Sequence, residues 1–498
     1  MNWDFILKEW GMIPNMALVV FSPSIIGMEL LGTMLGIFVG VTPGLTAVMG
    51  MSLMLGFAFR IPMEWGLALL IAIYTGAIFS GGITATMMNI PGTPAAAATC
   101  LDGFPLAKMG RAREAIGAVT IASGIGELLG ELFTLLSLPF IFLIALKFGD
   151  WEVFLACMAG VLVCGSLAGK EVIKGWISGI LGLLIAMVGM EEIWAYPRFA
   201  YHEVLIRGFN FVPALIGLFG ISEVLVVLKE KVPYQLAGKP GRAIIPFGIL
   251  KKNVKNIIRS ALIGIGIGCI PGIGESASCW VSYDFAYRAS KKKEAFGKGS
   301  FEGVIAAEVA NNATSGGALI PTLVLGIPGS GPTAILLAAL FIYGIRPGPM
   351  LMIERPGFVT FIVLLFWLSA IMIILAGLLL SSYVIRLLSI RREIILPIAT
   401  AMSILGAWGS GFTHFDVISA FAFGLVGYIM KVKGIPVAPM VLGILIGNIA
   451  DTSLRRALLT YMNDPLAMLA RPIGIGLMVL LFLMLFFSFK KKRGFGMS

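Results

Sequence analysis

Long apolar runs recur along the whole chain, and they restrict it to a fold that spans a membrane. Residues 358–380 (FVTFIVLLFWLSAIMIILAGLLL) and 473–489 (IGIGLMVLLFLMLFFSF) are two examples, and only 13% of the 498 residues are charged. A helix of about 20 apolar residues crosses a bilayer core of about 30 Å. The sequence therefore predicts an all-α polytopic membrane protein with roughly ten to twelve spans, and it lacks the alternating segments of a membrane β-barrel.

The basic residues behind the net charge of +11 lie mainly in short loops, so they indicate membrane orientation rather than nucleic-acid binding. The most basic stretch, residues 229–259, is expected to be a cytoplasmic connector. It separates a first membrane repeat (residues 1–228) from a second (residues 260–498), which would include C-terminal scaffold helices and a cytoplasmic tail. The N-terminus is expected on the periplasmic side, without a cleaved signal peptide.

Two Pro-Gly interruptions break the apolar runs in each half of the chain. Their prolines are Pro43 and Pro91 in the first half and Pro271 and Pro328 in the second, and we number these breaks one to four. Each earlier break follows a glycine-rich lead (GIFVGV, GIGIGC), and each later break follows a Ser-Gly-Gly string (SGGITATMMNIPG, SGGALIPTLVLGIPG). The shared order of these signals indicates an internal repeat.

Loop charges bear on the relative orientation of the two repeats. Between the third and fourth breaks, residues 288–298 carry five basic residues and one acid, whereas the corresponding loop of the first half carries only Arg60 and Glu64. Because basic loops stay in the cytoplasm, the two loops are expected on opposite sides of the membrane. The sequence thus favours two inverted-topology repeats with broken helices or re-entrant hairpins.

The breaks themselves suggest a binding site. A proline inside a helix costs about 3 kcal/mol, and non-helical backbone at membrane depth occurs only inside protein or beside a water-filled cavity. A helix that begins at such a break directs unpaired N–H groups and a partial positive charge into the cavity, which attracts an anion. Four breaks meeting near the membrane midplane would form an anion pocket lined by hydroxyls and amides.

Several long strings resemble the large membrane subunit of tripartite tricarboxylate transporters. The strongest lies in residues 269–351, with IPGIGESAS, FGKGSFEGVIAAEVANNATSGGALIPTLVLGIPGSGPTA and GIRPGPML, and the first half matches through GVTPGL and YTGAIFSGGITATMMNIPGTP. This resemblance implies secondary import of carboxylates across the bacterial inner membrane, driven by an ion gradient and an elevator-type movement. The implied partners are a small four-span membrane subunit and a periplasmic solute-binding protein. Glu275 departs from the pattern, because a small uncharged residue is expected there.

The breaks and the resemblance together give two sets of candidate site residues. Substrate carboxylates would be held by Thr42, Pro43, Gly44, Thr84, Asn89, Pro91, Gly92, Thr93, Pro271, Gly272, Gly274, Ser276, Pro328, Gly329 and Ser330. A coupling cation, Na⁺ or H⁺, would be held by Glu308, Asn311, Asn312 and Ser315. No other metal or cofactor is expected, and the chain lacks the G-x-x-x-x-G-K-[ST] phosphate loop of an ATP-driven transporter.

The remaining acidic residues leave alternatives open. Glu127 and Glu131 lie four residues apart without a basic neighbour, so they could carry protons, face the small subunit or lie near a membrane interface. An extra carboxylate at Glu275 could alter substrate charge preference or cation coupling. Glu223 and Asp416 are expected at an interface, while the identity of the carboxylate and a homodimeric state stay open.

The sequence also leaves two rivals to transport by a coupled carrier. A membrane-embedded Ser-His hydrolase would have to use His202 or His414, the only histidines, and His414 lies two residues before Asp416. The serine-rich breaks contain no histidine, which disfavours an enzyme. A passive anion channel would admit carboxylates without regard to a binding protein or an ion gradient.

Overall fold

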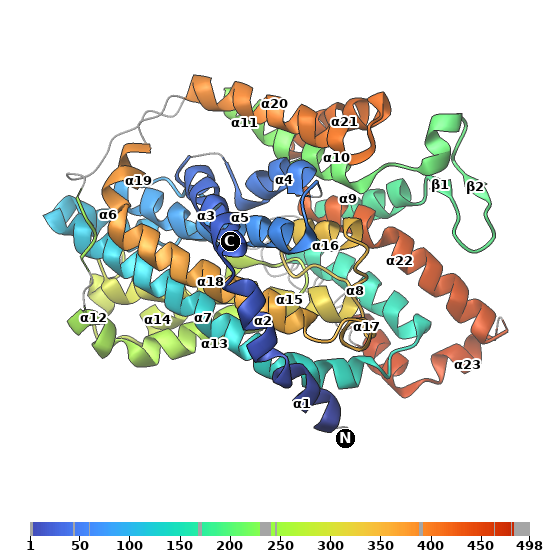
Figure 1. Cartoon of the computed structure of the whole chain (residues 1–498), viewed down its shortest axis with the longest axis horizontal. Helices are drawn as coiled ribbons and strands as arrows, with labels where there is room; N and C mark the ends of the chain where they lie inside the picture. The colour runs from blue at the N-terminus through green and yellow to red at the C-terminus, as the bar shows by residue number, and fades with distance from the viewer. Residues whose placement is uncertain are drawn as a thin grey trace, which may run out of the picture.

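The computed structural model describes residues 3–42, 45–58, 60–167, 172–229, 241–244, 247–387, 392–462, 464–479 and 481–482. These residues are almost entirely helical (Figure 1). The exception within them is a short antiparallel hairpin, in which β1 (Gly189–Met190) pairs with β2 (Pro197–Arg198). The all-α expectation therefore holds apart from this hairpin, whose few residues lie outside the long apolar runs.

Six helical stretches of the described chain are long and apolar enough to cross a membrane, which confirms a multi-pass membrane protein. They are α3 (Pro23–Val41), α5 (Met63–Met88), the stretch Cys100–Ala145 that includes α6 (Cys100–Leu106) and α7 (Ala112–Ala145), the stretch Phe211–Lys229, α18 (Phe358–Leu379) and α21 (His414–Val432). Shorter apolar helices are α4 (Ala47–Ala58), α9 (Val172–Ala186) and α16 (Gly331–Ile342). A total of roughly ten to twelve spans stays a prediction.

In the first half, α3 runs closely along α5. A Cβ atom placed on Gly36 would lie 2.5 Å from the carbonyl oxygen of Ile73, and one on Gly40 would lie 2.1 Å from that of Ala77. Any larger residue would therefore push the two backbones apart. The first break separates α3 from α4, and α5 ends at Asn89, whose φ of 55° turns the chain into the second break.

The second half repeats this arrangement with other residues. Here α13 (Val254–Gly268) runs along α15 (Phe301–Leu325), and a Cβ on Gly264 would lie 2.3 Å from the carbonyl oxygen of Ala310. The third break separates α13 from α14 (Glu275–Ala289). The fourth break begins at Gly326, where a φ of 68° ends α15 before α16 starts.

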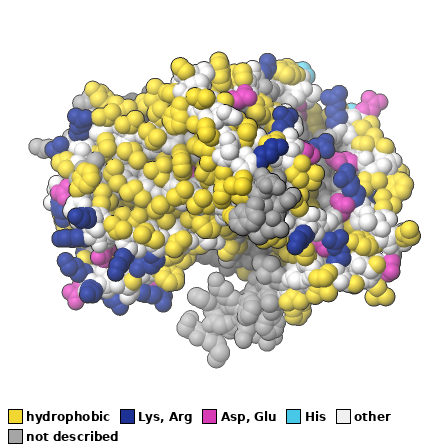
Figure 2. Space-filling view, turned by 60° about the horizontal axis from the view of Figure 1, so that its bottom comes forward, with side chains coloured by type: hydrophobic (Ala, Val, Ile, Leu, Met, Phe, Trp, Pro, Cys, Tyr) yellow, Lys and Arg dark blue, Asp and Glu magenta, His cyan; other side chains and the backbone are white. Residues whose placement is uncertain are grey.

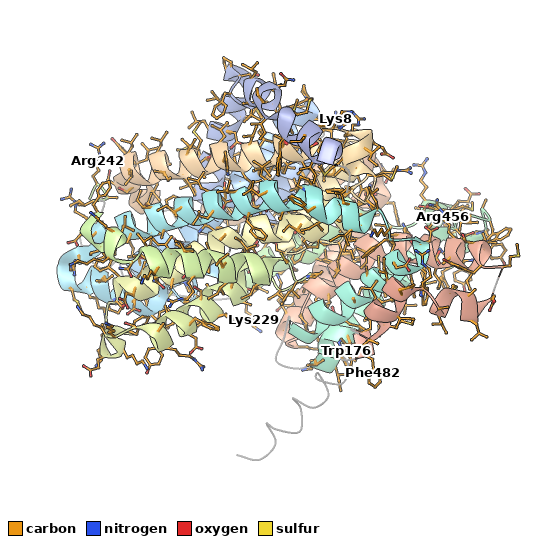
Figure 3. All side chains as sticks on the ribbon, turned by 90° about the horizontal axis from the view of Figure 1, so that it is seen from below. Lys8, Trp176, Lys229, Arg242, Arg456 and Phe482 are labelled. Atoms are coloured by element: carbon orange, nitrogen blue, oxygen red, sulfur yellow. The ribbon has the colours of Figure 1, made fainter. Side chains whose placement is uncertain are left out.

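The two halves pack directly against each other. Helix α7 of the first half lies against α15, where a Cβ on Gly126 would be 2.4 Å from the carbonyl oxygen of Val309. Helices α18, α7 and the α13–α14 hairpin lie side by side with similar axes (Figure 3). A second group, α8 (Asp150–Leu167), α9 and α22 (Ala438–Thr460), lies toward the opposite end from Arg242 (Figures 1 and 3).

The predicted boundaries at residues 228 and 259 stay a prediction. Helix α12 (Phe247–Lys252) and the start of α13 at Val254 already lie within the stretch expected to be a connector. Much of the remaining connector and the C-terminal tail lie outside the described residues. Hydrophobic side chains cover most of the left and centre of the face in Figure 2, as expected for a lipid-facing surface. Lys and Arg cluster at its lower left, and further basic and acidic side chains lie on its right.

Candidate functional site

The four breaks meet around one cavity of about 540 Å³, which we call the central cavity. Its wall includes Thr46 from the first break, Thr93 from the second, residues 272–276 around the third and Gly331 after the fourth. Pro43 and Gly44 of the first break lie outside the described residues. Segments that are far apart in the sequence thus converge on a single hollow.

Three helices begin at this cavity. The first residues of α4, α14 and α16 line it, so their N-terminal N–H groups and the positive ends of their dipoles lie at its wall. Thr46 caps α4 by accepting a hydrogen bond from the Met49 N–H at 3.1 Å, and Ser330 and Thr333 form a capping box on α16. Gly274 precedes α14 with a φ of 64° and supplies no side-chain cap.

Charged side chains also line the central cavity. Glu275 accepts a hydrogen bond from the Tyr74 hydroxyl, which lies 3.3 Å from the Ser330 hydroxyl. Lys431 on α21 also lines the cavity and forms an ion pair with Glu223 on α11 (Ser222–Lys229). The cavity therefore combines three helix N-termini, a lysine and two carboxylates. The helix N-termini and the lysine are the groups that could balance the charge of a bound anion.

Some predicted substrate residues line this cavity and others do not. Thr93, Gly272, Gly274 and Ser276 lie on its wall. An adjoining hollow of about 20 Å³ is lined by Gly272, Pro328, Ser330 and other residues. Thr42, Thr84, Asn89, Pro91, Gly92, Pro271 and Gly329 are not among the residues that line either hollow. Their assignment to the substrate stays a prediction, as does that of the residues on the wall.

The residues away from the wall have structural contacts. Thr42 donates to the Phe38 carbonyl at 2.7 Å, and Thr84 donates to the carbonyls of Ser80 and Val41. A Cβ on Gly92 would lie 2.0 Å from the Gly40 carbonyl oxygen. Similarly, the Gly329 carbonyl accepts a hydrogen bond from the Gly272 N–H at 2.9 Å, which joins the third and fourth breaks.

A second group of polar residues is buried where α7 and α15 pack, and we call it the α7–α15 cluster. It consists of Glu127, Glu131, Glu308, Asn311, Asn312 and Ser315, each with no more than 1% of its surface exposed. Glu308 accepts hydrogen bonds from Thr99 at 2.5 Å and Ser123 at 3.0 Å. A Cβ on Gly82 would lie 2.5 Å from the Glu308 carboxylate, so this glycine makes room for the acid.

The α7–α15 cluster has more oxygen atoms than partners. Ser315 donates to Glu127 at 2.8 Å, and the Asn312 amide nitrogen donates to the Glu308 carbonyl at 2.9 Å. Both carboxylate oxygens of Glu131, both amide atoms of Asn311 and the Asn312 side-chain oxygen have no partner among the described residues. Unpaired buried oxygens are costly, and they are the ligands that Na⁺ or a proton would satisfy.

The burial of Glu127 and Glu131 excludes some of the roles that the sequence left open for these two acids. Because Glu127 and Glu131 are buried inside the chain, their side chains reach neither lipid nor a surface that a partner subunit could contact. Glu223, expected at an interface, lies on the cavity wall instead. Asp416 accepts a hydrogen bond from Thr413 at 2.7 Å at the start of α21.

The histidines give no support to an enzyme. His202 accepts a hydrogen bond from the Val204 N–H at 3.3 Å, and the His414 ring lies 5.1 Å from that of Trp408. Within the described chain, no hydrogen bond joins either histidine to a serine, and neither histidine lines the central cavity.

Sequence reasoning missed Tyr74, Lys431, Thr99 and Ser123 as site residues. Lys431 lies in the last turn of α21, two residues before Lys433, so the sequence gives it the appearance of an ordinary basic residue at a helix end. Tyr74 lies in the middle of an apolar helix, where a hydroxyl is a weak signal of a buried partner.

This fold and cavity define a multi-pass helical membrane protein with an interior cavity at which three helices begin. The chain belongs to the tripartite tricarboxylate transporter TctA family, whose sequence model matches residues 26–442. This family is the large membrane subunit of these transporters, which confirms the resemblance. Membership implies tricarboxylate transport rather than an enzymatic role, and it implies partner subunits.

Two curated relatives are similar over long stretches. The uncharacterized 52.8 kDa protein in the TAR-I ttuC' 3' region of Agrobacterium vitis is 30% identical over 452 residues, or 90% of this chain and 89% of that protein. An uncharacterized protein in the TAR-II ttuC' 3' region of the same organism is 30% identical over 232 residues, or 46% of this chain and 96% of that protein. No solved structure matches this chain.

Proposed function

We propose that this protein imports a carboxylate across the bacterial inner membrane as a secondary active transporter. The substrate would be a tricarboxylate such as citrate, or a related di- or aromatic carboxylate, delivered by a periplasmic solute-binding protein. The observation that carries this proposal is the convergence of three helix N-termini and Lys431 on the central cavity. A small four-span membrane subunit would complete the complex, which could form a homodimer, with the C-terminus of this chain in the cytoplasm.

Electrostatics favour an anion with more than one charge. Each helix N-terminus stabilises a nearby anion by about 0.3–1 kcal/mol, and by up to about 2 kcal/mol when partly buried. A hydrogen bond from a charged donor such as Lys431 adds about 1.5–3 kcal/mol. Because Lys431 belongs to α21 and the helix ends belong to α4, α14 and α16, a substrate with two separated carboxylates would use both sets of donors.

The α7–α15 cluster is the proposed coupling site. Its unpaired oxygens on Asn311, Asn312 and Glu131 suit Na⁺, which is bound through oxygen, or a proton, which would neutralise a carboxylate. Within the described residues, no ion pair links Glu308 or Glu127 to a lysine or arginine. A cation would therefore remove the cost of burying these acids.

The proposed architecture is two inverted repeats that move in an elevator-like manner. The glycine contacts support the repeat, because Gly36 and Gly40 on α3 meet α5 as Gly264 and Gly268 on α13 meet α15. Each pair is spaced by one helical turn, and each lies directly before a break. The opposite orientation is inferred from loop charges, and the movement from family resemblance.

The test is uptake of radiolabelled carboxylates by proteoliposomes that contain this chain, the small membrane subunit and the binding protein. Mono-, di- and tricarboxylates are compared while the Na⁺ gradient and the pH gradient are varied separately. We expect accumulation that requires the binding protein and one of the two gradients. Uptake that depends on neither the binding protein nor an ion gradient would indicate a passive anion channel and overturn the proposal.

A further inference from the structure

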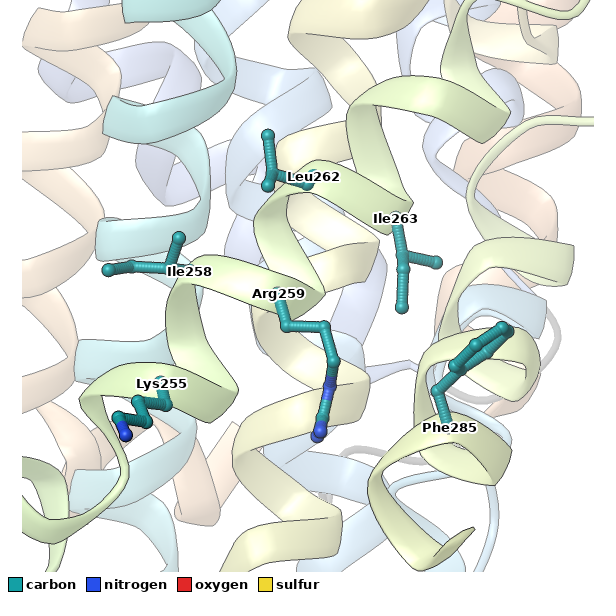
Figure 4. A pocket seen from close by; sticks show the side chains of 6 residues that line it. All are labelled: Lys255, Ile258, Arg259, Leu262, Ile263 and Phe285. Atoms are coloured by element: carbon teal, nitrogen blue, oxygen red, sulfur yellow. The ribbon is translucent and has the colours of Figure 1, made fainter. Parts of the chain in front are cut away.

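A groove on the outer surface of the α13–α14 hairpin is unrelated to the central cavity. It has a volume of about 500 Å³, and Figure 4 shows the six side chains that line it: Lys255, Ile258, Arg259, Leu262, Ile263 and Phe285. Five of them are on α13, and Phe285 faces them from α14. The groove therefore follows the line along which the two helices meet.

The groove has a cationic end and an apolar end. In Figure 4 the nitrogen atoms of Lys255 and Arg259 lie at one end, while Leu262 and Ile263 lie further along α13. Ile258, Leu262 and Phe285 are 52%, 58% and 51% exposed, respectively. In a membrane protein such side chains face lipid, so an acyl chain can lie along them.

Arg259 has a free donor at the cationic end. One terminal nitrogen donates to the Asn256 side chain, but the Nε–H, which is shielded from solvent, has no partner among the described residues. No acid is among the six residues that line the groove, and nearby Asp284 is already paired with Arg288 at 2.7 Å. The two cations are thus left without a counter-ion on the protein side of the groove.

The cationic end lies at the basic edge of the apolar surface. Lys251 and Lys252 on α12 directly precede α13, and the loop after α14 carries further lysines. Lys and Arg gather toward this end of the molecule in Figure 2. The positive-inside rule places such an edge at the cytoplasmic leaflet, whose anionic lipids attract basic side chains.

We propose that this groove binds an anionic phospholipid. The headgroup phosphate accepts hydrogen bonds from Arg259 and Lys255, and one acyl chain lies along Ile258 and Leu262 against Phe285. Basic pockets between membrane helices on the cytoplasmic side suit anionic headgroups for the same reason. The lipid would thereby fix the position of α14, whose first turn lines the central cavity.

The experiment is native mass spectrometry of the full chain, titrated with phosphatidylglycerol or phosphatidylcholine of matched chain length. We expect wild-type protein to retain phosphatidylglycerol selectively, and the K255A/R259A variant to bind it about tenfold more weakly. The matched control is K251A/K252A, which removes two exposed lysines outside the groove and should bind like wild type. If wild-type protein retained phosphatidylglycerol and phosphatidylcholine equally, that result alone would overturn the proposal.

Two further arms identify the occupant. Inorganic phosphate at millimolar concentration should leave phosphatidylglycerol bound, since the acyl chain contributes to binding; complete displacement would indicate a simple anion site. A photocrosslinker introduced at Leu262 in membranes that contain the small subunit should react with lipid. Crosslinking to that subunit instead would show that the groove is a protein interface and would overturn the proposal.

Discussion

The central cavity and the α7–α15 cluster are both polar regions inside an apolar protein, yet they are built in opposite ways. The cavity is a hollow whose wall includes helix ends, hydroxyls, the Lys431–Glu223 ion pair and Glu275. The cluster is closely packed, consists of carboxylates and amides, and holds several oxygens without partners among the described residues. Under the proposed function, the cavity binds the substrate anion and the cluster binds the coupling cation, so the two regions should respond differently to substitution.

Glu275 is the point at which the two regions resemble each other. It is a carboxylate on the wall of the central cavity, hydrogen-bonded by Tyr74 and located in the first turn of α14. It occupies one of the helix ends that would otherwise serve the substrate. Substitutions in the cluster and in the cavity should therefore cause different transport defects.

The largest effect is expected for Glu308→Gln in the α7–α15 cluster. The amide keeps the shape of the side chain but removes the charge that a coupling cation would meet. Gradient-driven accumulation should fall about 100-fold, corresponding to a loss of about 3 kcal/mol, in reconstituted vesicles. The control is Glu294→Gln, an exposed acid in the loop after α14. Unchanged accumulation at an equal protein level would remove the cluster from the coupling mechanism.

A smaller effect is expected for Lys431→Gln in the central cavity. Losing a charged donor should raise the KM for a tricarboxylate by about 10- to 100-fold, and that for a monocarboxylate by much less. Lys433→Gln is the matched control, because Lys433 is exposed just after α21. Equal effects on mono- and tricarboxylates would show that Lys431 does not contact a second carboxylate.

A modest effect of opposite sign is expected for Glu275→Gln. The substitution removes a negative charge from the cavity wall but keeps a hydrogen-bond acceptor for Tyr74. The KM for a tricarboxylate should therefore fall by about three- to tenfold, with Glu354→Gln, an exposed acid, as the control. A rise in KM, or a loss of gradient dependence, would place Glu275 with the coupling residues instead.

The smallest effect is expected at the close contact between α13 and α15. Gly268→Ala would place a methyl group 2.4 Å from the Thr314 carbonyl oxygen, and the strain should cost about 1–3 kcal/mol. We expect the apparent Tm in detergent to fall by a few degrees. Gly266→Ala on the same helix meets nothing within 4 Å and should be neutral. Equal Tm values for the two variants would show that the α13–α15 contact tolerates separation.

The sequence was sufficient to predict the class of fold and the convergence of the breaks. Pro-Gly pairs within apolar runs are local signals, and a helix that begins at membrane depth must face a hollow or another protein segment. That reasoning correctly pointed to Thr93, Ser276 and Ser330 as residues close to a cavity. It also selected Glu308 and Ser315, which the structure buries together with Glu127.

The site residues that the sequence did not predict are defined by contacts between segments that are distant in the chain. Tyr74 and Glu275 are 201 residues apart, and Lys431 and Glu223 are 208 residues apart, so no local pattern links them. The sequence could also not reveal that Thr42 would bond to a carbonyl of its own helix rather than face the cavity. Such bonds to the preceding turn are a common use of threonine near helix ends.

The glycine contacts along α15 limit how the molecule can work. This helix touches α13 and α7 backbone to backbone, so it cannot bend or slide between them without opening voids. It also carries the α7–α15 cluster and leads directly into the fourth break. If the proposed sites are correct, α15 sets the distance between the bound ion and the substrate, and a movement of this helix would carry both sites together.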